Sequence, residues 1–103
     1  MKKIQQRVKE FCKKYDLEYS PEYHLLDTMS ELGEVTKEVL KMTDYGKKPL
    51  KFKEEIKSEL GDVIYSLVTV ANSFNVDLEQ ALEMVLEKYE KRLKKGGAGS
   101  END

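Results

Sequence analysis

The chain has 103 residues, which is enough for one domain with one modest hydrophobic core. Charged residues make up 37% and hydrophobic residues 39%, a balance typical of a helical protein with charged outer faces and too apolar for a disordered chain. Lysine and arginine number 18 against 20 acidic residues, so the net charge is −2. This charge provides no cationic field for nucleic acid, and we expect no nucleic-acid partner.

The sequence also favours a cytoplasmic protein. Its one cysteine, Cys12, has no partner for an internal disulfide, which indicates a reducing compartment. The first residues, MKKIQQRVKEFC, lack the apolar core of a signal peptide. The longest apolar stretch, VIYSLVTVA (63–71), is far shorter than the ~20 residues that span a membrane, so we expect no membrane association.

Four helices are predicted in chain order. Apolar residues at helical spacing predict a first helix from about residue 2 to residue 15. A second begins with Ser20 as the N-cap and Pro21 at the first helical position, and it runs to about residue 43. The stretch DYGKKPL (44–50) ends it through its glycine and proline. A third helix is expected from about residue 52 to residue 74.

The fourth helix is expected to start at Asp77, which forms a capping-box-like signal with Gln80, and to end near residue 95. We therefore predict an all-α fold of the four-helix-bundle type, with one domain over residues 1–95 and a disordered tail over residues 96–103. The second and third helices carry apolar arcs too wide for one small bundle to cover. We expect a homo-oligomer, either a dimer or a dimer of dimers.

One short motif occurs twice: SELGEV at residues 30–35 and SELGDV at residues 58–63. Residues three apart on a helix share a face, so Glu31 and Glu34 point the same way, and so do Glu59 and Asp62. No lysine interrupts either acidic stripe. Each motif also carries a glycine within a helix, where glycine costs about 1 kcal/mol relative to alanine, and we expect it to permit close approach of another helix.

Two interpretations of the repeat remain open from the residues alone. The stripes could be solvated faces that arose by chance, because an exposed like-charge pair costs only ~0.2–0.5 kcal/mol. If the stripes face each other in a partly buried groove, two carboxylates at about 4 Å repel by ~4 kcal/mol, and a divalent cation relieves this. Carboxylates without His or Cys ligands favour Mg²⁺ over zinc, and the Glu-x-x-His pairs of a di-iron bundle are absent.

The pattern Glu-x-x-Glu, 24 intervening residues, then Glu-x-x-Asp resembles the MazG-like, all-α nucleoside triphosphate pyrophosphohydrolases. The likeness continues through GDVIYSLVTVAN (61–72) and NVDLEQALEMVLEKYEKR (75–92). It implies an oligomeric helical enzyme that cleaves a nucleoside or deoxynucleoside triphosphate to the monophosphate and pyrophosphate with Mg²⁺, as house-cleaning of the nucleotide pool. By the same resemblance, the metal ligands and catalytic carboxylates would be Glu31, Glu34, Glu59 and Asp62.

Other site residues follow from the resemblance alone. Lys88 and Arg92 resemble a basic pair that contacts phosphate, and Asn72 resembles a position near the nucleotide. A solvated basic helix end and a surface amide are the corresponding structural interpretations. Ser30 stands where the family often has a further glutamate, and either Glu38 or Glu55 could orient the attacking water. The alternatives are a related helical pyrophosphohydrolase acting on another diphosphate, such as phosphoribosyl-ATP, or a non-catalytic nucleotide-binding or partner-binding helical module.

Overall fold

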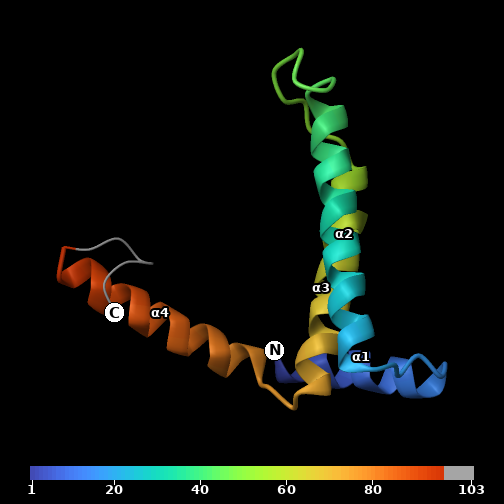
Figure 1. Ribbon diagram of the computed structural model, residues 1–103, viewed down its shortest axis with the longest axis vertical. Coiled ribbons are helices and arrows are strands. Elements are labelled where there is room, and N and C mark those ends of the chain that lie inside the picture. The colour runs from blue at the N-terminus through green and yellow to red at the C-terminus, as the bar shows by residue number, and fades with distance from the viewer. Residues whose placement is uncertain (97–103) are drawn as a thin grey trace.

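The protein is described by a computed structural model that covers residues 1–96. Over that range it consists of four helices and no strand, as the sequence predicts: α1 (Lys2–Lys14), α2 (Pro21–Met42), α3 (Glu55–Ser73) and α4 (Leu78–Lys94) (Figure 1). Disorder was predicted for residues 96–103. Residues 97–103 lie outside the described part of the chain.

Local side-chain signals account for the starts of α2 and α4. The Ser20 Oγ accepts a hydrogen bond from the Tyr23 N–H at 3.2 Å, so the predicted cap of α2 is confirmed. The Asp77 carboxylate caps α4 in the same way by accepting from two N–H groups of its first turn. The third helix begins at Glu55, later than predicted. The Lys51 N–H donates to the Met42 carbonyl at the end of α2, so the chain just before α3 is tied to the end of α2.

The central unit is a hairpin in which α2 and α3 lie antiparallel, while α1 crosses its base and packs on α3 (Figure 1). The buried apolar core of the described residues is small and comprises Cys12, Met42, Val68 and Ala71. Several polar residues are equally buried at the junction of the three helices, namely Gln5, His24, Ser66 and Thr69. The hairpin therefore places two long helices side by side, but one chain encloses little apolar volume.

The fourth helix does not join the hairpin. Asn75 adopts a left-handed conformation (φ 56°) after α3, and α4 then leads away from the hairpin (Figure 1). The Gln5 side chain fixes this turn by donating to the Val76 carbonyl at 2.8 Å and accepting from the Leu78 N–H at 2.9 Å. The predicted four-helix bundle is thus not closed within residues 1–96 of a single chain, because the turn directs α4 outward.

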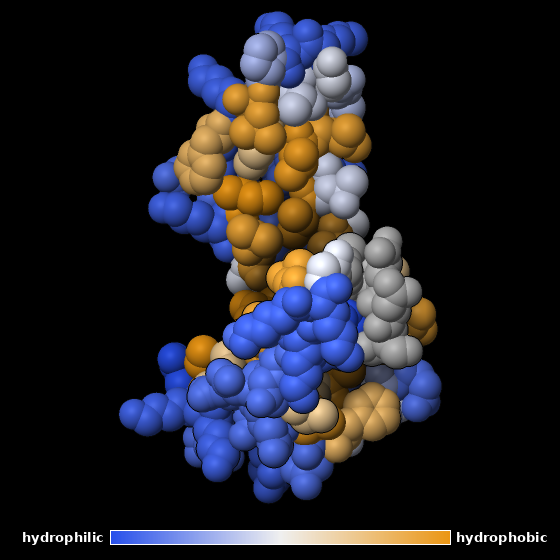
Figure 2. Space-filling view, turned by 90° about the vertical axis from the view of Figure 1, so that its left-hand side faces the viewer, coloured by the Kyte–Doolittle hydropathy of each residue, from blue (hydrophilic) through white to orange (hydrophobic). Residues whose placement is uncertain are grey.

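Large apolar side chains remain exposed on the hairpin and on α4. Figure 2 shows apolar surface along the hairpin, on the side toward which α4 projects. The exposed residues on α2, α3 and α4 include Leu26, Met29, Leu32, Leu60, Ile64, Leu82, Leu86 and Leu93. An added Cβ at Gly33 or Gly61 would meet no atom of another helix within 4 Å, so the expected close helix approach at these glycines is not made among residues 1–96. No helix among the described residues is long and apolar enough to cross a membrane.

Candidate metal centre

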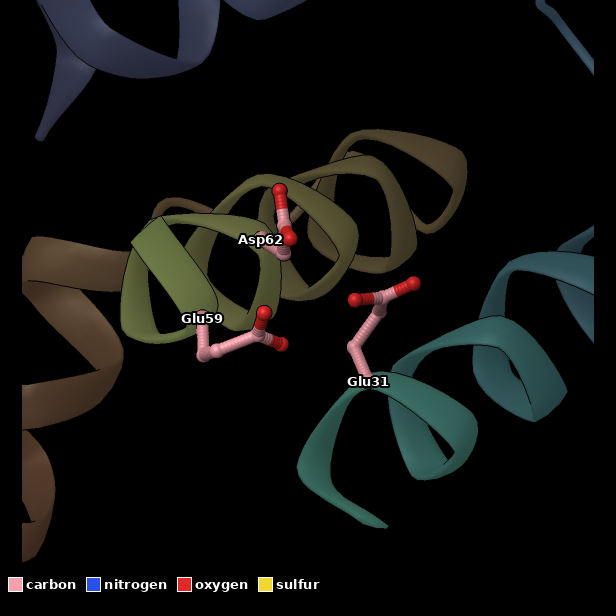
Figure 3. Close-up of side chains that lie close together, drawn as sticks. All are labelled: Glu31, Glu59 and Asp62. Atoms are coloured by element: carbon pink, nitrogen blue, oxygen red, sulfur yellow. The ribbon is translucent and has the colours of Figure 1, made fainter. Parts of the chain in front are cut away.

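Three carboxylates from the repeated motif meet across the α2–α3 hairpin. Glu31 extends from α2, while Glu59 and Asp62 extend from successive turns of α3 (Figure 3). One carboxylate oxygen of each lies within 4.8 Å of those of the other two. The two motifs come together because α2 and α3 run antiparallel, with each motif close to the same level of the hairpin. Of the two interpretations that the sequence left open, the positions of these three residues agree with stripes that face each other.

The electrostatics of the cluster centre on Glu31, which is half-buried. Its pKa is raised above the ordinary glutamate value, first by partial removal from water and then by the negative charges of Asp62, Asp27, Glu59 and Glu34. Both causes disfavour the ionised carboxylate. A cation at this point would reverse the second cause, because it would attract the charges that now repel one another.

The remaining acidic candidates occupy different positions. Glu34 lies one turn beyond Glu31, is exposed, and adds to the charge that acts on Glu31 without joining the group of three. Glu38 forms an ion pair with Lys41, with 3.5 Å between Oε1 and Nζ, and its side chain is largely buried. Glu55 is exposed in the first turn of α3. The structure thus gives Glu38 a defined cationic partner on its own helix.

A neighbouring contact extends the polar seam of the hairpin toward its base. The Ser66 hydroxyl donates to Asp27 Oδ2 at 3.0 Å and joins α3 to α2 beside the cluster. Asp27 lies four residues before Glu31 on α2 and therefore shares its helix face, whereas Ser66 was not identified from the sequence. The signal was present, since Ser66 lies four residues after Asp62 and therefore shares its face.

The three residues predicted to bind substrate lie apart from the carboxylates. Lys88 and Arg92 are on α4, which leads away from the hairpin, and their cationic groups lie 5.5 Å and 5.8 Å from the centre of the Tyr89 ring. Asn72 is near the end of α3, where its side-chain amide exchanges hydrogen bonds with Gln5. A single chain therefore does not bring these residues beside the cluster.

The donor set determines which ions the cluster could hold. Three carboxylates supply only hard oxygen ligands, which suit Mg²⁺, whose remaining positions are filled by water or by substrate phosphates. The zinc-type residues of the chain are placed elsewhere: the His24 Nε2 accepts from the Tyr19 N–H, and the Cys12 Sγ contacts the Tyr65 hydroxyl at 3.2 Å. Chemically, the arrangement can bind a divalent cation and so neutralise a polyphosphate.

Comparison with known proteins gives matches over most of the chain. Residues 19–96 match the family model described as the MazG nucleotide pyrophosphohydrolase domain. The chain is 39% identical over 98 residues to the uncharacterised protein YpjD of Bacillus subtilis, covering 91% of this chain and 86% of YpjD.

Two crystal structures have a similar fold. That of YpjD, a candidate pyrophosphatase, has a TM-score of 0.73 and 36% identity, covering 89% of this chain and 94% of YpjD. That of the Bacillus-conserved MazG protein, a nucleotide pyrophosphohydrolase, has a TM-score of 0.72 and 31% identity, with 85% and 86% of the two chains covered.

Proposed function

Since this chain belongs to the MazG nucleotide pyrophosphohydrolase family of phosphoanhydride hydrolases, we propose that it cleaves nucleoside triphosphates in a Mg²⁺-dependent reaction. The products would be a nucleoside or deoxynucleoside monophosphate and pyrophosphate, and the role would be house-cleaning of the nucleotide pool. The observation that carries the proposal is the meeting of Glu31, Glu59 and Asp62 within 4.8 Å across two helices. A nucleotide substrate and a single buried cysteine support a cytoplasmic location.

The residues fit a magnesium ion. Three carboxylate oxygens converge, and burial followed by the neighbouring negative charges raises the pKa of Glu31. Glu31, Glu59 and Asp62 would hold the ion, and Glu34, one turn along α2, is the fourth carboxylate that we assign to the site. When bound, Mg²⁺ supplies positive charge to the phosphate oxygens and lowers the pKa of a water molecule. The protein's part is to position the triphosphate and to hold the carboxylates together, where the charge of the bound ion would favour their ionised form.

We also propose that the working enzyme is a homo-oligomer, a dimer or a dimer of dimers. The small core of one chain and the exposed leucines of α2, α3 and α4 support this, because apolar faces of this kind are usually covered by another element. The same assembly would bring Lys88 and Arg92 from the α4 of one copy to the carboxylates of another. Arginine and lysine there would bind the phosphate oxygens of the substrate.

The proposal is tested by pyrophosphate release from a panel of ribo- and deoxynucleoside triphosphates, with Mg²⁺ and with EDTA. The parent protein should release pyrophosphate only with Mg²⁺, and Glu59→Gln should reduce the rate by about 100-fold or more, since it removes a charged ligand without changing the side-chain volume. Glu10→Gln, an exposed substitution on α1, is the matched control and should behave as the parent.

The outcomes of this assay distinguish a nucleoside triphosphate pyrophosphohydrolase from a related hydrolase and from a non-catalytic module. Release that requires Mg²⁺ and is lost in Glu59→Gln alone would support the proposal and rank the bases in one experiment. A folded, oligomeric protein that releases pyrophosphate from no nucleoside triphosphate would overturn it. Including phosphoribosyl-ATP in the panel identifies a related activity, and tight nucleotide binding without turnover would identify a non-catalytic module.

A further inference from the structure

A pocket of about 240 Å³ lies at the base of the hairpin, where α1, α2 and α3 meet. Its floor is buried and consists of Cys12, His24 and Thr69, each less than a tenth exposed. Its rim is open to solvent and carries side chains of several kinds, namely Lys9, Glu18, Tyr19, Pro21, Asn72 and Ser73. This pocket is separate from the three carboxylates and takes no part in holding the metal ion.

The pocket and the carboxylates lie along the same seam. His24 precedes Glu31 by seven residues, and Thr69 follows Asp62 by seven, so each pair shares a helix face two turns apart. Because α2 and α3 are antiparallel, both displacements lead toward the same end of the hairpin. Two turns correspond to about 10 Å along the helix axes. The sugar and base of a nucleotide extend over a comparable length from its phosphates.

The chemistry of the pocket suits a flat ring with hydrogen-bonding edges. Tyr19, about half exposed, packs against Tyr23 and His24 with ring centres 4.8 Å and 5.9 Å away, and so presents an aromatic surface beside the opening. Lys9 supplies a donor and Glu18 an acceptor, while the Asn72 amide, which already exchanges hydrogen bonds with Gln5, lines the same opening. Aromatic surface combined with a few polar groups is the usual composition of a small-molecule site, and nucleobases stack on such rings.

We propose that this pocket receives the nucleobase of the substrate, with Tyr19 as the stacking residue and the phosphates directed along the seam toward Glu31, Glu59 and Asp62. The inference rests on the proposed function, since it takes a nucleotide as the substrate. Beyond that function, it assigns base selectivity to the residues that line this pocket. Asp27, which the buried Ser66 joins to α3 between the two ends, would then lie beside the sugar.

Base binding can be measured by fluorescence without hydrolysis. The chain contains no tryptophan, so one introduced tryptophan gives the only indole signal. A Tyr19→Trp variant places a single fluorescent indole at the pocket rim. Titration with nucleoside monophosphates in EDTA should change its emission saturably, while inorganic pyrophosphate, which has no base, should not. Tyr45→Trp, in the exposed turn after α2, is the matched control and should respond to neither. An emission unchanged by every monophosphate, or changed equally by pyrophosphate, would overturn the proposal.

Kinetics of a Tyr19→Ala variant give a second, independent measurement. We expect KM for nucleoside triphosphates to rise about tenfold with little change in kcat, as for loss of one stacking contact. Inhibition by inorganic triphosphate should remain as in the parent. Equal weakening of inorganic triphosphate would overturn the assignment of Tyr19 to the base.

The pocket and the reaction can fail separately. A saturable response of Tyr19→Trp to monophosphates in a protein that releases no pyrophosphate would uphold the pocket and contradict the proposed function. Pyrophosphate release without any such response would uphold the reaction and contradict the pocket.

Discussion

Gln5 and Asn72 hold each other across the base of the molecule, although 67 residues separate them in the chain. The Gln5 Nε2 donates to Asn72 Oδ1 at 3.1 Å, and the Asn72 Nδ2 donates back to the Gln5 carbonyl at 3.0 Å. The same Gln5 side chain bonds Val76 and Leu78 in the turn that follows. One buried glutamine of α1 therefore fixes the end of α3 and the direction in which α4 leaves.

This arrangement predicts that Gln5→Ala lowers the free energy of unfolding by about 2–3 kcal/mol. The substitution leaves the part-buried backbone groups at residues 76 and 78 without their partner. Each unpaired group costs about 1–3 kcal/mol of stability, and hydrogen bonds to water reduce this cost. Urea denaturation at one fixed protein concentration measures the change, since assembly would make stability depend on concentration. Gln6→Ala, at the exposed neighbouring position, should stay within about 0.5 kcal/mol of the parent.

A loss in Gln5→Ala no greater than in Gln6→Ala would contradict the structural role of Gln5. The comparison also bears on Asn72, which the family resemblance assigns to the substrate. If the hydrogen bonds with Gln5 position the Asn72 side chain for the substrate, Gln5→Ala should change KM in the same direction as Asn72→Ala.

Signals within a few residues of one another made the helices predictable. Ser20 and Pro21 specify the start of α2 locally, and so does Asp77 for α4, so both were identified from the sequence. The direction of α4 was not identified from the sequence, because it depends on the buried Gln5. No sequence pattern separates this glutamine from exposed ones such as Gln6. The meeting of Glu31, Glu59 and Asp62 in the candidate site could be anticipated from the repeated motif, which fixes their spacing along each helix. The Asp27–Ser66 contact was not identified, although each residue lies four positions from a carboxylate of the motif on its own helix.

A second prediction concerns the stability of the carboxylate cluster without metal. In EDTA, Glu31→Gln should raise the melting temperature by about 1–4 °C, because it removes one of several like charges from a half-buried position. With saturating Mg²⁺ the order should reverse: the parent gains stability by binding the ion, while the variant gains much less. Thermal unfolding followed by circular dichroism, with and without Mg²⁺, measures both effects.

The control for this experiment is Glu10→Gln on α1, which removes an exposed charge far from the repeat in sequence. It should show the same Mg²⁺-dependent shift as the parent. A Glu31→Gln variant that keeps the full Mg²⁺-dependent shift would show that Glu31 does not hold the ion. A melting temperature in EDTA below that of the parent would show that favourable contacts of the Glu31 carboxylate outweigh its repulsion by the neighbouring charges.

The third prediction is a pH dependence that arises from Tyr65. Burial, followed by the hydrogen bond and charge interaction with Cys12, raises the pKa of Tyr65 from 10.0 to about 12. The folded protein thus holds the phenol proton more tightly than the unfolded chain does. The resulting stability is present in full below pH 10 and is lost as the pH rises through about 12.

Ultraviolet absorbance of ionised tyrosine measures this titration directly. Tyr65→Phe should remove a component that titrates above the ordinary tyrosine range, at about pH 12. A component lost from the early part of the titration in Tyr65→Phe would contradict the assigned direction of the pKa shift.

The fourth prediction tests whether α4 completes the site of a second copy. Lys88 and Arg92 lie on a helix that leads away from its own hairpin, so in the proposed assembly the two halves of the site would come from different chains. Glu59→Gln and Arg92→Ala should each be inactive alone. If assembly is a dimer, mixing equal amounts after dissociation and reassociation should restore about a quarter of the parent activity, since half of the dimers carry one intact site out of two.

The matched control mixes Glu59→Gln with Asp62→Asn. Both substitutions alter carboxylates of α3, so every site in a mixed dimer contains one defect and no activity should return. Recovery in the first mixture and none in the second requires that the carboxylates and the basic pair come from different subunits. No recovery in either mixture, although subunit exchange is confirmed by a size or mass label, would place Arg92 with the carboxylates of its own chain. The α3–α4 turn held by Gln5 would then have to open for α4 to fold back on the hairpin.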